Sequence, residues 1–205
     1  MTRFTDEERQ RIGEELHRAG RDQFTRFGLE RTRIEDLTDE VGIGTSTFYQ
    51  FFDSKGALYL SIIARERERV ESDLDEALEG VTDARAEVRT TIEHFLTELS
   101  SNPLYYRLLM DDELQRLNER VDVEVLEAHH REGMATADDR VRRWIAEESF
   151  RVEDPARLQA LFRLLGFTVA AESELFEPAG ATDLYEDARA LLVDAVVDGL
   201  FVEDA

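Results

Sequence analysis

Arg33 to Lys55 read RIEDLTDEVGIGTSTFYQFFDSK, and this stretch decides the fold. Its first part carries apolar residues at helical spacing, so that one face is buried: Ile34, Leu37 and Val41. Gly42 follows directly and supplies the left-handed backbone state with which many helices end. Ile43 then fills the turn beneath it. Because a second helical pattern starts at Thr45, we expect a helix-turn-helix over residues 33–52.

The second helix of this pair is expected at residues 45–52. Phe48 and Phe52 are four residues apart and therefore share its inward face. Tyr49 and Gln50 point outward. Small hydroxyl residues occupy its N-terminal end, where a recognition helix meets the major groove of DNA.

Helices are also expected on both sides of this pair. Residues 11–27 have apolar positions at helical spacing and stop at Gly28, which predicts a supporting first helix. Residues 53–55 open a long fourth helix. The N-terminal part thus reads as a three-helix unit.

The run from Ala19 to Leu58 resembles the DNA-binding domain of TetR-type (tetracycline-repressor-like) transcriptional regulators. The resemblance rests on short motifs along the run: Phe24-x-x-Phe27-Gly28, Thr32, Gly42-Ile43, Thr47-Phe48-Tyr49-x-x-Phe52 and Ser54-Lys55-x-x-Leu58. It implies an all-α fold in which a three-helix DNA-binding domain at residues 1–60 is joined by a long helix to a helical domain at 61–205. That second domain would bind an effector and dimerise.

The family match also implies which side chains meet DNA. Gln50 can read adenine with its amide, while Tyr49 and Lys55 would contact phosphate. The full set of expected contacts is Thr32, Arg33, Thr45, Ser46, Thr47, Tyr49, Gln50 and Lys55. The family usually has a hydroxyl residue at position 44, a glycine at 46 and a threonine or serine at 33. Gly44, Ser46 and Arg33 depart from that pattern at contact positions.

The charge is unusual for a DNA-binding protein. The net charge is −22, and Lys55 is the single lysine beside 24 arginines. Residues 1–60 carry a net charge of −3 and residues 61–205 carry −19, so the expected DNA-facing end is the least acidic. In concentrated salt such charges are screened, and we interpret the composition as that of a halophilic archaeon. We then expect a shallow salt dependence of DNA binding.

The remainder of the chain is predicted to be helical. The most apolar segments are residues 155–175 and 182–201, which the resemblance makes the pairing helices of a homodimer. The expected interface comprises Leu158, Leu161, Phe162, Leu165, Val169, Leu184, Ala188, Leu191, Leu192, Ala195 and Val196. The alternative is that these helices complete a monomeric core.

The family also implies a small-molecule effector, which we expect to be apolar or amphipathic. Aromatic residues with polar tips are the candidates for its pocket. They are Phe95, Leu99, Tyr105, Tyr106, Met110, Trp144, Phe162 and Phe167.

The sequence contains no cysteine, no Gly-rich phosphate loop and no zinc-ligand spacing, so we expect no enzyme activity, cofactor or metal. Glu14-x-x-His17 and Glu127-x-x-His130 have the spacing of di-iron bundles, but chance pairs are frequent in so acidic a chain. Residues 1–8 read as the capped start of a helix, which predicts a cytoplasmic protein without a membrane partner. The main alternative function is a helical interaction module that has lost DNA binding.

Overall fold

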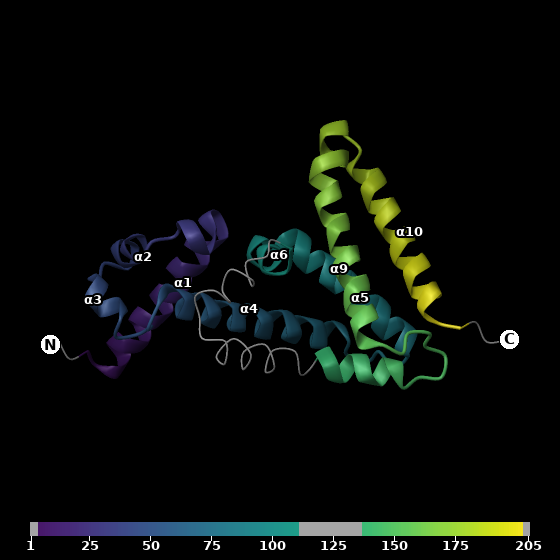
Figure 1. Ribbon diagram of the computed structural model, residues 1–205, viewed down its shortest axis with the longest axis horizontal. Helices are drawn as coiled ribbons and strands as arrows, with labels where there is room; N and C mark the ends of the chain where they lie inside the picture. The colour runs from purple at the N-terminus through teal and green to yellow at the C-terminus, as the bar shows by residue number, and fades with distance from the viewer. Residues whose placement is uncertain (1–3, 111–136, 203–205) are drawn as a thin grey trace. The chain divides into compact units, whose positions relative to one another are not determined.

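The computed structural model describes residues 4–110 and 137–202, and every regular element within them is helical (Figure 1). The described chain divides into two compact units. The first comprises residues 4–68 and 103–110, and the second comprises 69–102 and 137–202. None of the described helices is both long and apolar enough to cross a bilayer. The helical elements of both units confirm the predicted all-α fold.

The first unit is built from α1 (Asp6–Arg31), α2 (Ile34–Val41), α3 (Thr45–Phe48), the first half of α4 (Lys55–Ala77) and α6 (Pro103–Met110). Thr5 caps α1, because its hydroxyl accepts from the Glu8 amide at 3.2 Å while the Glu8 carboxylate accepts from the Thr5 amide at 2.9 Å. Gly28 interrupts α1 with a φ of 73°, at the position where the sequence predicts the end of the helix.

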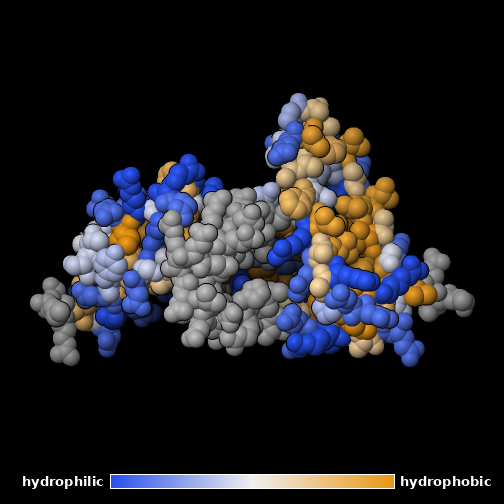
Figure 2. Space-filling view, viewed as in Figure 1, coloured by the Kyte–Doolittle hydropathy of each residue, from blue (hydrophilic) through white to orange (hydrophobic). Residues whose placement is uncertain are grey.

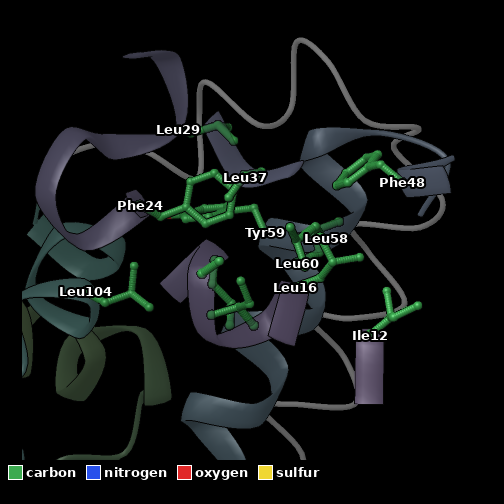
Figure 3. Close-up of a cluster of buried hydrophobic side chains, with 13 residues drawn as sticks. Ile12, Leu16, Phe24, Leu29, Leu37, Phe48, Leu58, Tyr59, Leu60 and Leu104 are labelled. Carbon is green, nitrogen blue, oxygen red and sulfur yellow. The ribbon is translucent and has the colours of Figure 1, made fainter. Parts of the chain in front are cut away.

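A continuous apolar core joins the helices of the first unit (Figure 3). Phe24 and Tyr59 meet edge to face with ring centroids 4.8 Å apart, and both side chains are fully buried. The core also contains Ile12, Leu16, Leu29, Leu37, Phe48, Leu58, Leu60 and Leu104. This core fixes α2 and α3 against α1 and α4.

Helices α1 and α4 approach each other closely at Gly20 of α1. A Cβ atom there would lie 2.7 Å from Ile62 Cδ1 and 3.1 Å from Leu58 Cδ2, and both of these side chains are buried. A Cβ at Gly13 on the same helix would meet nothing within 4 Å. We expect Gly20→Ala to lower the free energy of unfolding by about 1 kcal/mol through overpacking, and Gly13→Ala to raise it by about 0.5–1 kcal/mol. Urea denaturation measures both, and equal effects would contradict the close packing.

The second unit contains α5 (Ala84–Ser101), helical residues 137–145, α9 (Pro155–Ala171) and α10 (Thr182–Leu200). A π-helical turn (Glu172–Phe176) and a 3-10 turn (Glu177–Ala179) connect α9 to α10, which run in opposite directions (Figure 1). Both helices contact α5. A single antiparallel bridge pairs Phe150 with Phe201, so that the end of α10 is held to the chain before α9.

A buried arginine holds residues 137–145 in place. The side chain of Arg140 is 5% exposed and lies 3.0 Å from Asp75, 3.4 Å from Glu71 and 3.8 Å from Glu87. Three carboxylates around one guanidinium compensate the cost of burying its charge. The acidic composition of this unit is thus partly used in structural ion pairs.

Several expected boundaries differ from those of the structure. The second helix of the pair ends at Phe48 instead of residue 52, because residues 49–51 form a turn. The boundary expected at residue 60 falls inside α4, and residues 103–110 return to the first unit. Sequence patterns mark helix periodicity but do not show which helices pack together.

Candidate nucleic-acid interface

The turn between α2 and α3 has the geometry that the sequence predicts. Gly42 adopts a left-handed conformation with φ 74° and ψ 32°. The Ile43 amide donates to the Thr38 carbonyl at 2.9 Å, and the Gly42 amide donates to the Asp39 carbonyl at 3.3 Å. This is a Schellman motif, which ends α2 sharply and lets Ile43 pack on the core.

The short helix α3 has one anchored face and one open face. Phe48 is fully buried, and its ring lies 5.9 Å from that of Phe52. On the other side, Ser46 and Gln50 are exposed and Tyr49 is 54% exposed. Thr45 and Thr47 are half-buried. The open face therefore presents hydroxyl and amide groups, which can hydrogen-bond to base edges and phosphates.

Gly44 precedes α3 with φ −83°, a conformation that any residue adopts. A Cβ atom at this position would meet only Ser46 Oγ, at 3.9 Å. Backbone geometry therefore does not require glycine here. Its effect is that α3 begins without a side-chain cap.

Thr32, which the sequence analysis expects to contact DNA, is buried in the structure. The residue that caps α2 is Arg33, whose amide donates to the Asp36 carboxylate at 3.3 Å. Thr32 is 1% exposed, and its hydroxyl donates to the Gly28 carbonyl at 2.8 Å. This hydroxyl closes the end of α1 instead of reaching a DNA surface. Arg33 is exposed.

Lys55 has a structural role that the sequence did not indicate. Its ammonium donates to the Thr32 carbonyl at 2.6 Å and lies 3.4 Å from the Glu30 carbonyl. A cation at these carbonyls complements the negative end of α1. The only lysine of the chain thus ties α4 to the end of α1.

Arg9 is a residue of this region that the sequence analysis missed. Its Nη2 donates to the Gln50 carbonyl at 2.9 Å, and its guanidinium carbon lies 5.0 Å from the centre of the Phe51 ring. No motif pointed to it, because the contact joins residues 41 positions apart.

The pair Glu14-x-x-His17 has structural partners. Glu14 accepts two hydrogen bonds from Arg65, at 2.8 and 3.0 Å. His17 Nδ1 lies 2.8 Å from the Gly13 carbonyl, so it must carry the proton, and Nε2 lies 3.0 Å from Ser61 Oγ. The second pair, Glu127-x-x-His130, lies outside the described residues.

Partial burial lowers the pKa of His17, and Arg65 lowers it further, against opposing effects of the Gly13 carbonyl and Glu14. Between the folded pKa and the usual value near 6.5, the unfolded chain binds more protons than the folded one. We therefore expect the free energy of unfolding to fall as pH drops through this window. His17→Gln should remove this part of the dependence, which urea denaturation at pH 5–8 can measure. An unchanged pH profile would contradict it.

In the second unit, apolar side chains gather on the surface of α9 and α10 (Figure 2). On α10, the expected interface residues Leu184, Ala188, Leu191 and Ala195 are exposed, while Leu192 and Val196 are half-buried. On α9 the prediction selected the wrong face. The expected interface residues Leu158, Leu165 and Val169 are buried within the unit, and Leu161 and Phe162 are half-buried. Exposed apolar residues on α9 instead include Ala156, Ala160, Leu164 and Phe167.

These exposed residues form what we call the apolar stripes. Positions 160, 164 and 167 on α9, and 184, 188, 191 and 195 on α10, repeat at intervals of four and three, so each set occupies one helix face. Leu164 is 66% exposed and Leu191 is 70% exposed. Such surfaces typically mark an interaction site.

The expected pocket residues are divided between the two units. Tyr105 and Tyr106 lie on α6 in the first unit, and the side chain of Met110 is outside the description. In the second unit, the rings of Phe95 and Phe162 are 5.4 Å apart. Leu99 and Trp144 are buried, whereas Phe167 is 60% exposed and belongs to the apolar stripes. Within the described residues, Trp144 Nε1 is buried without a hydrogen-bond partner.

The described chain is thus an all-helical protein that contains a helix-turn-helix with an open, polar α3. Residues 16–62 match the family model described as bacterial regulatory proteins of the tetR family. Over 95 residues the chain is 27% identical to the HTH-type transcriptional activator FasR of Mycolicibacterium smegmatis, covering 46% of this chain and 43% of FasR. Over 71 residues it is 37% identical to the HTH-type transcriptional regulator EthR of the same organism, covering 34% and 33%.

The chain thus spans less than half the length of these curated relatives. The whole described fold is similar to that of a transcriptional regulator from Saccharomonospora viridis in complex with choline. The TM-score is 0.64 at 17% identity, over 95% of this chain and all of the other. Together, the matches show that residues 16–62 are similar to the N-terminal region of tetR-family regulators, and that the chain shares the all-α fold of the solved structure. They do not support the expected halophilic archaeal origin.

Proposed function

We propose that this protein is a homodimeric transcriptional regulator that binds a palindromic operator and is released from it by a small molecule. The observation that carries the proposal is the open face of α3, which is anchored by buried Phe48 and exposes Ser46, Tyr49 and Gln50. In this assignment Gln50 reads a base edge. Tyr49, Arg33 and the hydroxyls of Thr45, Ser46 and Thr47 contact phosphates or base edges.

Lys55 contributes positive charge near phosphate in this proposal. Its ammonium has three donors, and bonds to carbonyl oxygens at the end of α1 fix its position. A fixed ammonium loses little side-chain entropy when it meets an anion.

Dimerisation supplies the symmetry of the operator. The apolar stripes of α9 and α10 have a repeat that suits pairing with a second copy as a four-helix arrangement. Two copies would present two α3 helices to DNA, with half-sites about one helical turn apart or a multiple of this.

We assign the effector to the second unit and expect it to be apolar or amphipathic. Phe95 and Phe162 offer an aromatic surface there, and buried Trp144 Nε1 offers a donor. The Saccharomonospora viridis protein, which shares the fold, was solved in complex with choline, and this supports a small-molecule ligand for the present protein. A ligand that prefers the conformation unable to bind DNA is sufficient for release.

The proposal is tested by selecting random duplex DNA on the purified protein. We expect enrichment of a palindrome, and footprinting should show two protected half-sites on one face of the duplex. Failure to enrich any sequence, with a folded and dimeric protein, would favour an interaction module that no longer binds DNA. The sign of regulation is a separate question, since FasR is an activator.

We further propose that the excess of acidic residues suits the protein to concentrated salt. Repulsion among carboxylates should destabilise it when screening is weak. We expect helical content, followed by circular dichroism, to fall as potassium chloride is lowered from molar to ~0.1 M. A protein that keeps its full helical signal would contradict this adaptation.

A further inference from the structure

The end of α3 depends on a residue from a distant part of the chain. Backbone hydrogen bonds hold this end from one side, since the Gln50 amide donates to the Thr47 carbonyl and the Phe51 amide to the Phe48 carbonyl, both at 2.9 Å. The Gln50 carbonyl accepts a hydrogen bond from Arg9 on α1 at 2.9 Å.

Arg9 makes a second contact with the same short segment. Its guanidinium carbon is 5.0 Å from the centre of the Phe51 ring, and Phe51 in turn lies 6.3 Å from the Phe4 ring. A planar guanidinium can stack on a ring and donate a hydrogen bond at its edge at the same time, which a lysine ammonium cannot do. The position also suits a cation, because the carbonyl end of a helix carries partial negative charge.

These contacts bear directly on the open face of α3. Tyr49 and Gln50 lie beyond the last helical residue, so the helix ladder alone does not fix them. The Gln50 side chain leaves the backbone one atom from the carbonyl group that Arg9 holds. Fixing this carbonyl, and the ring of Phe51 beside it, therefore limits where the side-chain amide of Gln50 can point.

We propose that Arg9 is a positioning residue for base reading by α3. It holds the backbone between Gln50 and Phe51 in place and thereby preorganises the side-chain amide of Gln50, without contacting DNA itself. The proposal rests on the proposed function in that it concerns the same DNA-binding surface.

The experiment compares full-length wild type with Arg9→Ala, Arg9→Lys and Arg11→Ala. Arg11 is the matched control, because it lies on the same helix, is exposed and pairs with Glu15 at 3.0 Å. Two measurements are made: amide hydrogen exchange across the free protein, and affinity for the selected palindrome and a scrambled duplex at several salt concentrations.

We expect Arg9→Ala to speed exchange locally at residues 49–52 and to weaken palindrome binding by roughly tenfold. Binding to the scrambled duplex and the salt slope should stay as in wild type. Arg9→Lys should have an exchange rate at residues 49–52 and a palindrome affinity between those of wild type and Arg9→Ala. Arg11→Ala should match wild type in hydrogen exchange.

Three results would overturn the proposal. Equal weakening on both duplexes with a shallower salt slope would make Arg9 a phosphate contact. Faster exchange of Arg9→Ala throughout the first unit would mean that Arg9 stabilises the whole unit. Unchanged exchange at residues 49–52 would show that Arg9 does not hold the end of α3. If wild type selects no DNA, the proposed function fails, whereas the exchange data still decide whether Arg9 holds the end of α3.

Discussion

Replacing Leu191 by glutamate is expected to convert the proposed dimer into a monomer. Leu191 is 70% exposed at the middle of the stripe on α10. A two-fold interface would bury it twice, and each burial contributes about 1.5–3 kcal/mol. The variant loses this burial free energy and introduces two buried carboxylates. We therefore expect the dimer dissociation constant to rise by at least ~100-fold. Sedimentation equilibrium measures it.

The matched control for this variant is Ala190→Glu. Ala190 is the exposed neighbour of Leu191 and lies on the polar side of α10, at helical spacing from Asp183, Asp187 and Asp194. The Ala190→Glu substitution adds the same charge to the same helix, but outside the apolar stripes. Ala190→Glu should remain dimeric, and a Leu191→Glu protein that also remains dimeric would show that the stripes do not form the interface.

Replacing Gln50 by alanine is expected to cause the largest loss of operator specificity. A good bidentate contact to a base contributes about 1–3 kcal/mol of discrimination, and the dimer would make it twice. We therefore expect affinity for the selected palindrome to fall by roughly 100-fold, while binding to scrambled DNA changes little. Fluorescence anisotropy with both duplexes measures the ratio of the two dissociation constants.

Gln10→Ala serves as the control for the Gln50 variant. Gln10 is an exposed glutamine on α1 of the same unit, so its loss removes an amide without altering α3. Its binding should equal that of wild type. A Gln50→Ala protein with wild-type specificity would assign base reading to other residues of α3.

Local sequence chemistry was sufficient to predict the helix-turn-helix. Gly42 could be recognised because a helix end needs a left-handed residue, and Phe48 because its spacing from Phe52 sets the inward face. Both predictions depend on neighbours within a few residues. The structure confirms the turn and the buried face.

Contacts between distant residues were beyond the sequence. The clamp from Arg9 to Gln50 and the tie from Lys55 to the Thr32 carbonyl both join separate helices. Periodicity likewise could not tell the buried face of α9 from its exposed one, because apolar residues occur on both. Leu158 is buried whereas Leu164 is 66% exposed, and helical spacing alone does not encode this difference.

The decisive question for this protein is whether the open face of α3 reads DNA. Titrating the selected palindrome with wild type and Tyr49→Ala in molar potassium chloride answers it. Tyr49 is exposed beside Gln50, and its loss should leave folding and dimerisation intact. We predict saturable binding of one dimer per duplex by wild type and at least tenfold weaker binding by the variant. Equal binding by both proteins, or none by a folded wild type, would contradict DNA reading by this face of α3.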